Sequence, residues 1–121
     1  MAVKLNSEAL RFGEQLIEEG KYVADERGAW SDDKPSTEQE NAFIETHGYE
    51  AYGRWHLGID EDEPENTKAR YSFPYGDFDR VHRCGLLSAE SRAGQYKHVD
   101  IEDAASILHE MIDERATATQ R

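Results

Sequence analysis

The C-terminal half of the sequence carries one long stripe of helical periodicity. Side chains along it recur at i, i+4, i+8, i+11, i+15 and i+18, at Phe78, His82, Leu86, Ala89, Ala93 and Tyr96. Small residues spaced by four within this segment leave room for another backbone to approach, at Gly85, Ala89 and Ala93. A second apolar helical face follows Asp100 after a connection short enough for antiparallel neighbours. These patterns predict a close antiparallel helical hairpin from Phe78, capped by Asp77, to about Glu114.

The N-terminal half contains clear helix signals. Asn6 can cap a first helix that Gly20 ends, and Ser36–Gln39 forms a capping box that opens a helix through about Thr46. Gly48 interrupts that helix. A further short helix is then expected to carry an aromatic stripe and to end at Gly58, with the stripe formed by Tyr49, Tyr52 and either Trp55 or His56.

The remaining segments are predicted to be irregular. Residues 21–35 show at most a short extended piece at Tyr22–Ala24, and Phe73–Asp77 forms a tight aromatic turn. The predicted fold is therefore all-α or nearly so. It has four or five helices and an irregular aromatic loop before the C-terminal hairpin.

Aromatic residues decide between a folded and a disordered chain. Only 37% of the 121 residues are hydrophobic and 33% are charged, a composition that leans toward disorder. Two Trp, six Tyr and four Phe are nevertheless spread along the chain, and each can bury a large apolar area. The length suits one core. We expect a single helical domain over residues 1–115 and a disordered tail over 116–121.

Charge and cysteine content limit the possible partners and compartments. The net charge is −12, which repels nucleic acid and anionic lipid at long range. No stretch approaches the roughly 20 apolar residues that a membrane span needs. Cys84 is the only cysteine and the first residues lack a signal-peptide pattern, so a cytoplasmic protein is expected.

One stretch of the sequence is positive. Residues 68–97 contain six basic and three acidic residues, interleaved with aromatic side chains. This pattern is also found where single-stranded nucleic acid binds, but pairing of the arginines with the many carboxylates of the same chain is the favoured interpretation. The stretch could also contact another protein. The predicted contact surface consists of Tyr75, Asp77, Arg80, Arg83 and Arg92.

No motif of a known catalytic, cofactor or metal site is present. None of the five histidines belongs to a His-Glu-x-x-His pattern, and one cysteine excludes the common structural zinc sites. His82 and Cys84 stand two residues apart, which on the predicted helix directs them to different sides. A metal site assembled from histidines distant in sequence is the minor alternative. We therefore expect no catalytic residue, no cofactor and no metal.

An acidic segment follows the short aromatic helix. Residues 60–66 contain five carboxylates, which could suggest calcium. Counting from Asp60, Glu65 replaces the glycine of a calcium-binding loop and Tyr71 replaces its bidentate glutamate. A solvated, self-repelling loop is the favoured interpretation.

Several motifs resemble a small bacterial domain family. They are Phe73–Phe78, Val81–Arg83, Ala89–Gln95 and Asp100–Ala105, with Glu40–Phe43 and Trp55–Asp60 similar to upstream stretches of its stand-alone members. Residues 66–115 also resemble the tails of some phage capsid-assembly proteins. The family carries no assigned activity and transfers no catalytic residue. Its occurrence as a tail implies an interaction or assembly role.

Three functions are carried forward from the sequence. The first is a non-catalytic module that binds another protein. The second is a small enzyme or small-molecule binder that uses His56 or His82 in an aromatic pocket. The third is single-stranded nucleic-acid binding through residues 68–97.

Overall fold

The computed structural model describes residues 3–119, with side chains through residue 116. Over this range the helices are α1 (Ser7–Glu18), α2 (Trp30–Asp33), α3 (Thr37–Gly53), α4 (Arg83–Gln95) and α5 (Val99–Thr119), with a 3-10 turn η1 (Lys68–Arg70). The strands are β1 (Val3–Leu5), β2 (Tyr22–Val23), β3 (His56–Asp60), β4 (Tyr71–Pro74) and β5 (Val81–His82). The chain is 59% helix and 15% strand, so the fold is mixed and the all-α prediction is wrong.

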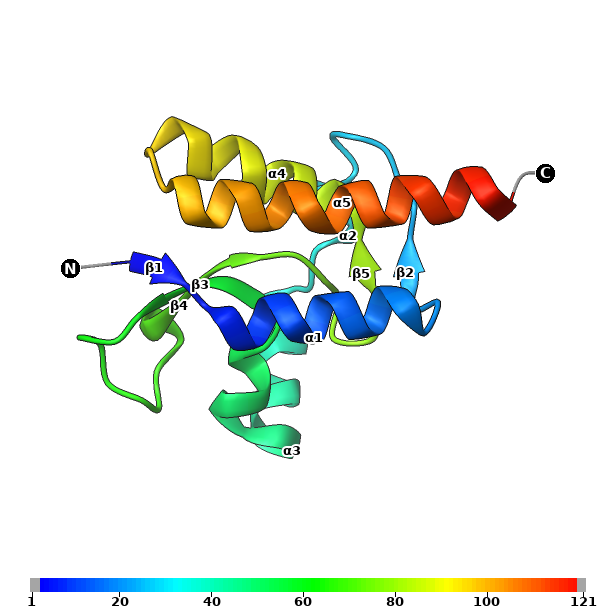
Figure 1. Cartoon of the computed structure of the whole chain (residues 1–121). Helices are drawn as coiled ribbons and strands as arrows, with labels where there is room; N and C mark the ends of the chain where they lie inside the picture. The colour runs from blue at the N-terminus through cyan, green and yellow to red at the C-terminus, as the bar shows by residue number, and fades with distance from the viewer. Residues whose placement is uncertain (1–2, 120–121) are drawn as a thin grey trace.

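Two small sheets lie between the helices (Figure 1). In the first, β3 is the central strand and pairs antiparallel with β1 and β4. In the second, β2 pairs parallel with β5. The sequence signal for β3 was misleading because four of its five residues are buried, so the apolar–polar alternation of a half-exposed strand is missing. The predicted aromatic helix ends before His56, where this strand begins.

The C-terminal hairpin is present, but it begins five residues later than predicted. Helix α4 starts at Arg83, and α4 and α5 lie side by side (Figure 1). Asp77 does not cap the helix. Its Oδ1 instead accepts hydrogen bonds from the backbone N–H groups of Asp79 and Arg80. Helix α5 continues to Thr119, past the expected boundary at residue 115, and residues 120–121 lie outside the described range.

The apolar core lies where the hairpin meets α1 and the first sheet. Its hairpin members include Leu86, Ala89, Ala93, Ile101, Ala104, Ala105, Leu108 and Ile112. Gly85, however, faces Trp30 and the carbonyl oxygen of Tyr75. A Cβ at Gly85 would lie 3.1 Å from the Trp30 ring and 3.0 Å from that carbonyl oxygen. Among the small residues Gly85, Ala89 and Ala93, the glycine therefore allows close contact with α2 and the aromatic loop, not with α5.

Several local signals in the N-terminal half are confirmed, but the cap expected at Asn6 is not. The Ser36–Gln39 capping box is formed, and Gly20 and Gly48 have φ of +81° and +86°. Asn6 precedes α1 but makes no side-chain cap hydrogen bond. Its amide donates instead to the carbonyl oxygens of Gly53 and His56, which ties α1 to β3. No helix within residues 3–119 combines the length and apolar character needed to cross a bilayer.

Candidate metal centre

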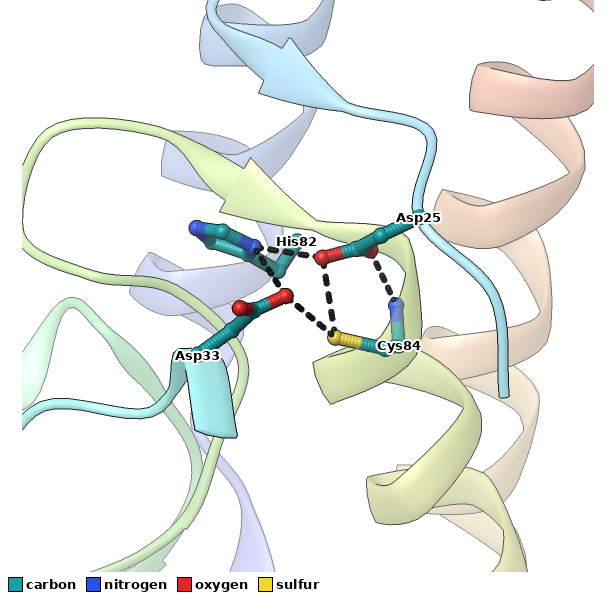
Figure 2. A group of neighbouring side chains, drawn as sticks. All are labelled: Asp25, Asp33, His82 and Cys84. Carbon is teal, nitrogen blue, oxygen red and sulfur yellow. Dashed lines mark hydrogen bonds and ion pairs between the residues drawn. The ribbon is translucent and has the colours of Figure 1, made fainter. Parts of the chain in front are cut away.

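Four potential metal-binding side chains meet at the start of α4: Asp25, Asp33, His82 and Cys84. One ligand atom from each lies within 4.8 Å of the others, and no second such group occurs among the described side chains. The residues come from the loop after β2, the end of α2, strand β5 and the first turn of α4 (Figure 2). The site is thus built where separate segments of the chain converge.

The short parallel sheet brings Asp25 to Cys84. Val23 in β2 is the register partner of His82 in β5. Two residues after this pair, the two parallel segments reach Asp25 and Cys84. Helix α4 has no side-chain cap of its own at His82. The Cys84 backbone N–H donates instead to Oδ1 of Asp25 at 2.8 Å. Asp25 therefore caps the helix from another strand, which fixes its carboxylate beside the thiol.

Asp33 reaches the site because α2 folds back onto α4. Gly28 adopts φ +96°, a conformation that L side chains rarely adopt, in the turn that leads into α2. Gly85 then allows the Trp30 ring to lie directly against α4. With α2 in this position, Oδ2 of Asp33 lies 3.8 Å from both Cys84 Sγ and His82 Nδ1. The Asp33 side chain is 36% exposed, so the cluster opens toward solvent on this side.

Both ring nitrogens of His82 face carboxylates. Nδ1 lies 2.7 Å from Oδ2 of Asp25, and Nε2 lies 2.7 Å from Oδ2 of Asp77. Asp77 is itself fixed by the backbone N–H groups of Asp79 and Arg80. Metal-binding histidines commonly donate their second N–H to a carboxylate, which orients the ring and makes it a stronger ligand. Asp77 is placed to do this for His82.

The carboxylates and His82 perturb one another. Burial acts to raise the pKa of Asp25, but hydrogen bonds from His82 and from the Cys84 backbone outweigh it and lower the pKa to about 2. The neighbouring Asp25 carboxylate raises the pKa of Asp33. Burial acts to lower the pKa of His82, but its hydrogen bonds to Asp25 and Asp77 raise it. Two carboxylates that repel each other across a small gap are a natural position for a cation.

The same surroundings argue against a cysteine nucleophile. Burial and the nearby Asp25 carboxylate raise the pKa of the Cys84 thiol. Catalytic cysteines sit in electropositive surroundings that lower this pKa and expose the thiolate. Cys84 has the opposite environment and is 1% exposed. A bound cation would reverse the effect, since it stabilises the thiolate as a ligand.

The separations within the cluster suit a tetrahedral ion. Zinc–ligand distances of about 2.0–2.3 Å place neighbouring ligand atoms roughly 3.3–3.7 Å apart. The corresponding separations from Oδ2 of Asp25 are 2.7 Å to His82 Nδ1 and 3.0 Å to Cys84 Sγ, and those from Asp33 are 3.8 Å. To reach that spacing, the two pairs that involve Asp25 would open by roughly half an ångström and the two that involve Asp33 would close by a few tenths of an ångström.

The predicted contact surface is not assembled as one patch. Tyr75 is fully buried, with its hydroxyl 2.7 Å from the carbonyl oxygen of Arg54, so its inclusion in a surface is wrong. Asp77 binds His82, and Arg83 pairs with Asp113 on α5 at 2.6 Å. Arg80 is exposed and lies before α4. Arg92 lies near the C-terminal end of α4, over the Phe73 ring.

His56 and His82 do not share a pocket. His56 is buried, and its Nδ1 lies 2.9 Å from the carbonyl oxygen of Tyr52. The cavity next to it is only about 30 Å³, room for one water molecule. His82 lies against Trp30, with ring centroids 5.9 Å apart, and belongs to the metal-binding cluster. Of the two, only His82 is combined with groups that can do chemistry.

Sequence reasoning missed Asp25, Asp33 and Cys84. The separation of His82 and Cys84 was judged on a helix, where it directs the side chains apart, but His82 is in an extended conformation with φ −105° and ψ 124°. Because His82 precedes the helix, the angular separation of two helical residues does not apply to this pair. That spacing was the one available signal. Nothing local in the sequence connects either aspartate to it.

Comparisons with known proteins add no relative: no family model, no curated protein sequence and no solved structure matches this chain.

Proposed function

We propose that this protein binds a divalent transition-metal ion, zinc in the first instance, through Asp25, Asp33, His82 and Cys84. The observation that carries the proposal is the convergence of two carboxylates, an imidazole and a thiol, with Asp77 on the far nitrogen of that imidazole. Thiolate and imidazole ligands favour zinc over magnesium or calcium, which take oxygen ligands.

Electrostatics support a cation at this position more than a purely structural network. Asp25 and Asp33 face each other and the thiol, and Asp77 adds a third carboxylate behind His82. A structural network needs only enough acceptors for its donors. Here three carboxylates surround one imidazole, which can carry a single positive charge, so a divalent ion would offset the remaining negative charge.

Cobalt(II) spectroscopy tests the site directly. Cobalt replaces zinc in tetrahedral sites, and a thiolate ligand gives it a charge-transfer absorption that carboxylates do not. We expect EDTA-treated protein to develop this absorption on titration with cobalt(II) and to lose it when zinc is added. Cys84→Ser should abolish the thiolate band. The absence of the band in wild-type protein would contradict the proposal.

Thermal denaturation supplies a second test with a matched control. A ligand at about 100 times its Kd stabilises the folded state by about 2.7 kcal/mol, which should raise the Tm by about 10 °C. Asp33→Asn should reduce this rise. Asp32→Asn removes the adjacent, exposed carboxylate and should leave the rise unchanged. Equal behaviour of the two variants would show that zinc binds elsewhere.

The protein-interaction function stays a prediction. Arg80 and Arg92 are the members of the predicted contact surface with exposed side chains. Nothing in the described part of the chain identifies a protein that would bind these two arginines. The metal-binding proposal does not depend on whether such a partner exists.

A further inference from the structure

A solvent-open hollow of about 380 Å³ adjoins the cluster on the outer side of Cys84. It lies between the turn before α2 and the outer face of α4. Three cationic residues line it, Arg27, Lys34 and Arg92, together with three hydroxyl groups, those of Ser31, Ser88 and Ser91. Trp30 and the Cys84 side chain form part of its wall.

The charge of this lining contrasts with that of the whole molecule. The chain has a net charge of −12, with 26 acidic and 14 basic residues, yet the lining includes three cations and no carboxylate. A concave surface with one sign of charge focuses the field and attracts ligands of the opposite sign. The residues also come from two separate segments, so their clustering is a product of the fold.

The three cations are not neutralised by carboxylates of the described residues. Neither Arg27, Lys34 nor Arg92 forms an ion pair with any described side chain, although carboxylates are abundant. Arg92 instead lies over the ring of Phe73 at 6.0 Å from its centroid, which positions the guanidinium without neutralising it. Their charges are therefore available to a ligand, along with serine hydroxyls that can donate hydrogen bonds.

A second cavity with additional apolar side chains adjoins the hollow. This cavity of about 150 Å³ shares Trp30, Lys34, Ser88 and Arg92 with the hollow and is also lined by Phe73, Pro74 and Ala89. Together the two spaces combine three cations with the rings of Trp30 and Phe73. This combination suits a ligand that has an anionic group and an apolar or aromatic part.

We infer that this cationic hollow binds a small organic anion, with the phosphate or carboxylate group at Arg27, Lys34 and Arg92 and its apolar part against Trp30 and Phe73. This goes beyond the metal proposal and does not require it. Asp25 and Asp33 lie behind the Cys84 thiol, and a metal ion there would cancel part of their charge and strengthen the attraction for the anion.

Nuclear magnetic resonance can test this with an internal control. The chain has two tryptophans, so its indole N–H region contains two signals: Trp30 lines the hollow, and Trp55 is buried against Phe12. EDTA-treated protein is titrated with phenyl phosphate, with benzoate and with uncharged benzyl alcohol. We expect saturable shifts of the Trp30 signal with one or both anions, much smaller shifts with benzyl alcohol, and little change at Trp55.

Charge variants locate the binding site. Because a charge-assisted contact is lost, Arg92→Gln and Lys34→Gln should each raise the Kd for the bound anion by about tenfold. Arg80→Gln makes the same change at an exposed arginine outside the hollow and should leave the Kd unchanged. Comparing phenyl phosphate with benzoate then distinguishes a phosphate ligand from a carboxylate ligand.

Several results would overturn the inference. They are no shift of Trp30 with either anion, equal shifts with benzyl alcohol, and equal Kd values for Arg92→Gln and Arg80→Gln. Binding that appears only after zinc is added, and that Arg92→Gln and Lys34→Gln do not weaken, would also overturn it, because the anion would then be held by the metal. Failure of zinc binding with retained anion binding would contradict only the metal proposal.

Discussion

His56 and His82 occupy regions that treat the same side chain in opposite ways. His56 lies among rings, with its centroid 4.4 Å from that of Tyr52 and 6.2 Å from that of Tyr71. Burial there lowers its pKa to about 4. His82 lies between Asp25 and Asp77, whose hydrogen bonds outweigh burial and raise its pKa. One histidine is kept neutral and the other is surrounded by negative charge.

The difference separates a structural region from a functional one. The aromatic region around His56 pairs His56 Nδ1 with the carbonyl oxygen of Tyr52 and leaves a cavity for only one water molecule. The region around His82 gathers three carboxylates, and the neighbouring Asp25 carboxylate raises the pKa of Asp33. Groups whose pKa values are shifted by specific charged partners are candidates for function. By this criterion His82 qualifies and His56 does not.

Replacing each of the two histidines in turn should give the largest difference in zinc affinity. His82→Gln should lower zinc affinity by more than about 100-fold, beyond the range expected for an outer partner, because a ligand is lost. His56→Gln should leave zinc affinity unchanged, even if it lowers the Tm. Competition with a zinc chelator of known affinity measures both. Equal zinc affinities of the two variants would remove the distinction between the regions.

The outer carboxylate should have the next largest effect. Asp77→Asn keeps an acceptor for His82 Nε2 but removes the charge, so zinc affinity should fall by about 10- to 100-fold. Asp79→Asn is the matched control, since it changes an exposed carboxylate in the same turn. The same chelator competition applies. If both variants bind zinc like wild type, Asp77 does not orient a ligand.

The pH dependence of stability should reveal the neutral histidine. His56 has a pKa of about 4 when folded and 6.5 as the reference value, so between these pH values the unfolded chain binds more protons. The free energy of unfolding should therefore fall by about 2 kcal/mol from pH 7 to pH 5 because of this residue alone. His82 acts with the opposite sign, since its pKa is raised.

Urea unfolding in EDTA at several pH values measures this contribution. The difference between wild type and His56→Gln isolates it, because His82 is present in both proteins. The wild-type protein should lose stability relative to the variant as the pH falls. A difference that is constant from pH 7 to pH 5 would show that His56 is not held neutral by burial.

The smallest effect on zinc affinity is expected from a substitution at Gly85. In Gly85→Ala a new methyl group would press on Trp30 and displace α2, and Asp33 with it. A gain in helix propensity of about 1 kcal/mol should offset an overpacking cost of about the same size, so stability without zinc should change little. Zinc affinity should fall severalfold. Gly94→Ala, which meets only the flexible end of Glu102, is the control and should bind zinc normally.

Elements with local signals were predicted well. The capping box at Ser36–Gln39, the interruptions at Gly20 and Gly48 and the periodicity of α4 and α5 all appear in the structure. Each depends on contacts within a few residues of the chain. The start of α4 was misplaced by five residues, because the helical stripe extends back through residues that form the aromatic loop and β5.

Strands and the metal-binding cluster were not predictable in the same way. β1 has three residues and β2 and β5 have two each, too few for a pattern, and β3 is buried on both faces. The contacts from Asp25 to His82 and Cys84 span 57 and 59 residues, so no local spacing encodes them. Placing α4 at Phe78 also directed His82 and Cys84 apart and concealed the one short-range pair.

The sequence by itself determined most of the longer helices and several of their ends, because capping and amphipathic periodicity act between neighbours along the chain. Only the tertiary structure decided that Asp25 caps a helix more than fifty residues away and that Asp33 arrives through the contact of Trp30 with Gly85. Ligand sets and charged hollows arise from packing between distant segments. Such packing depends on which surfaces meet, and a linear pattern does not record that.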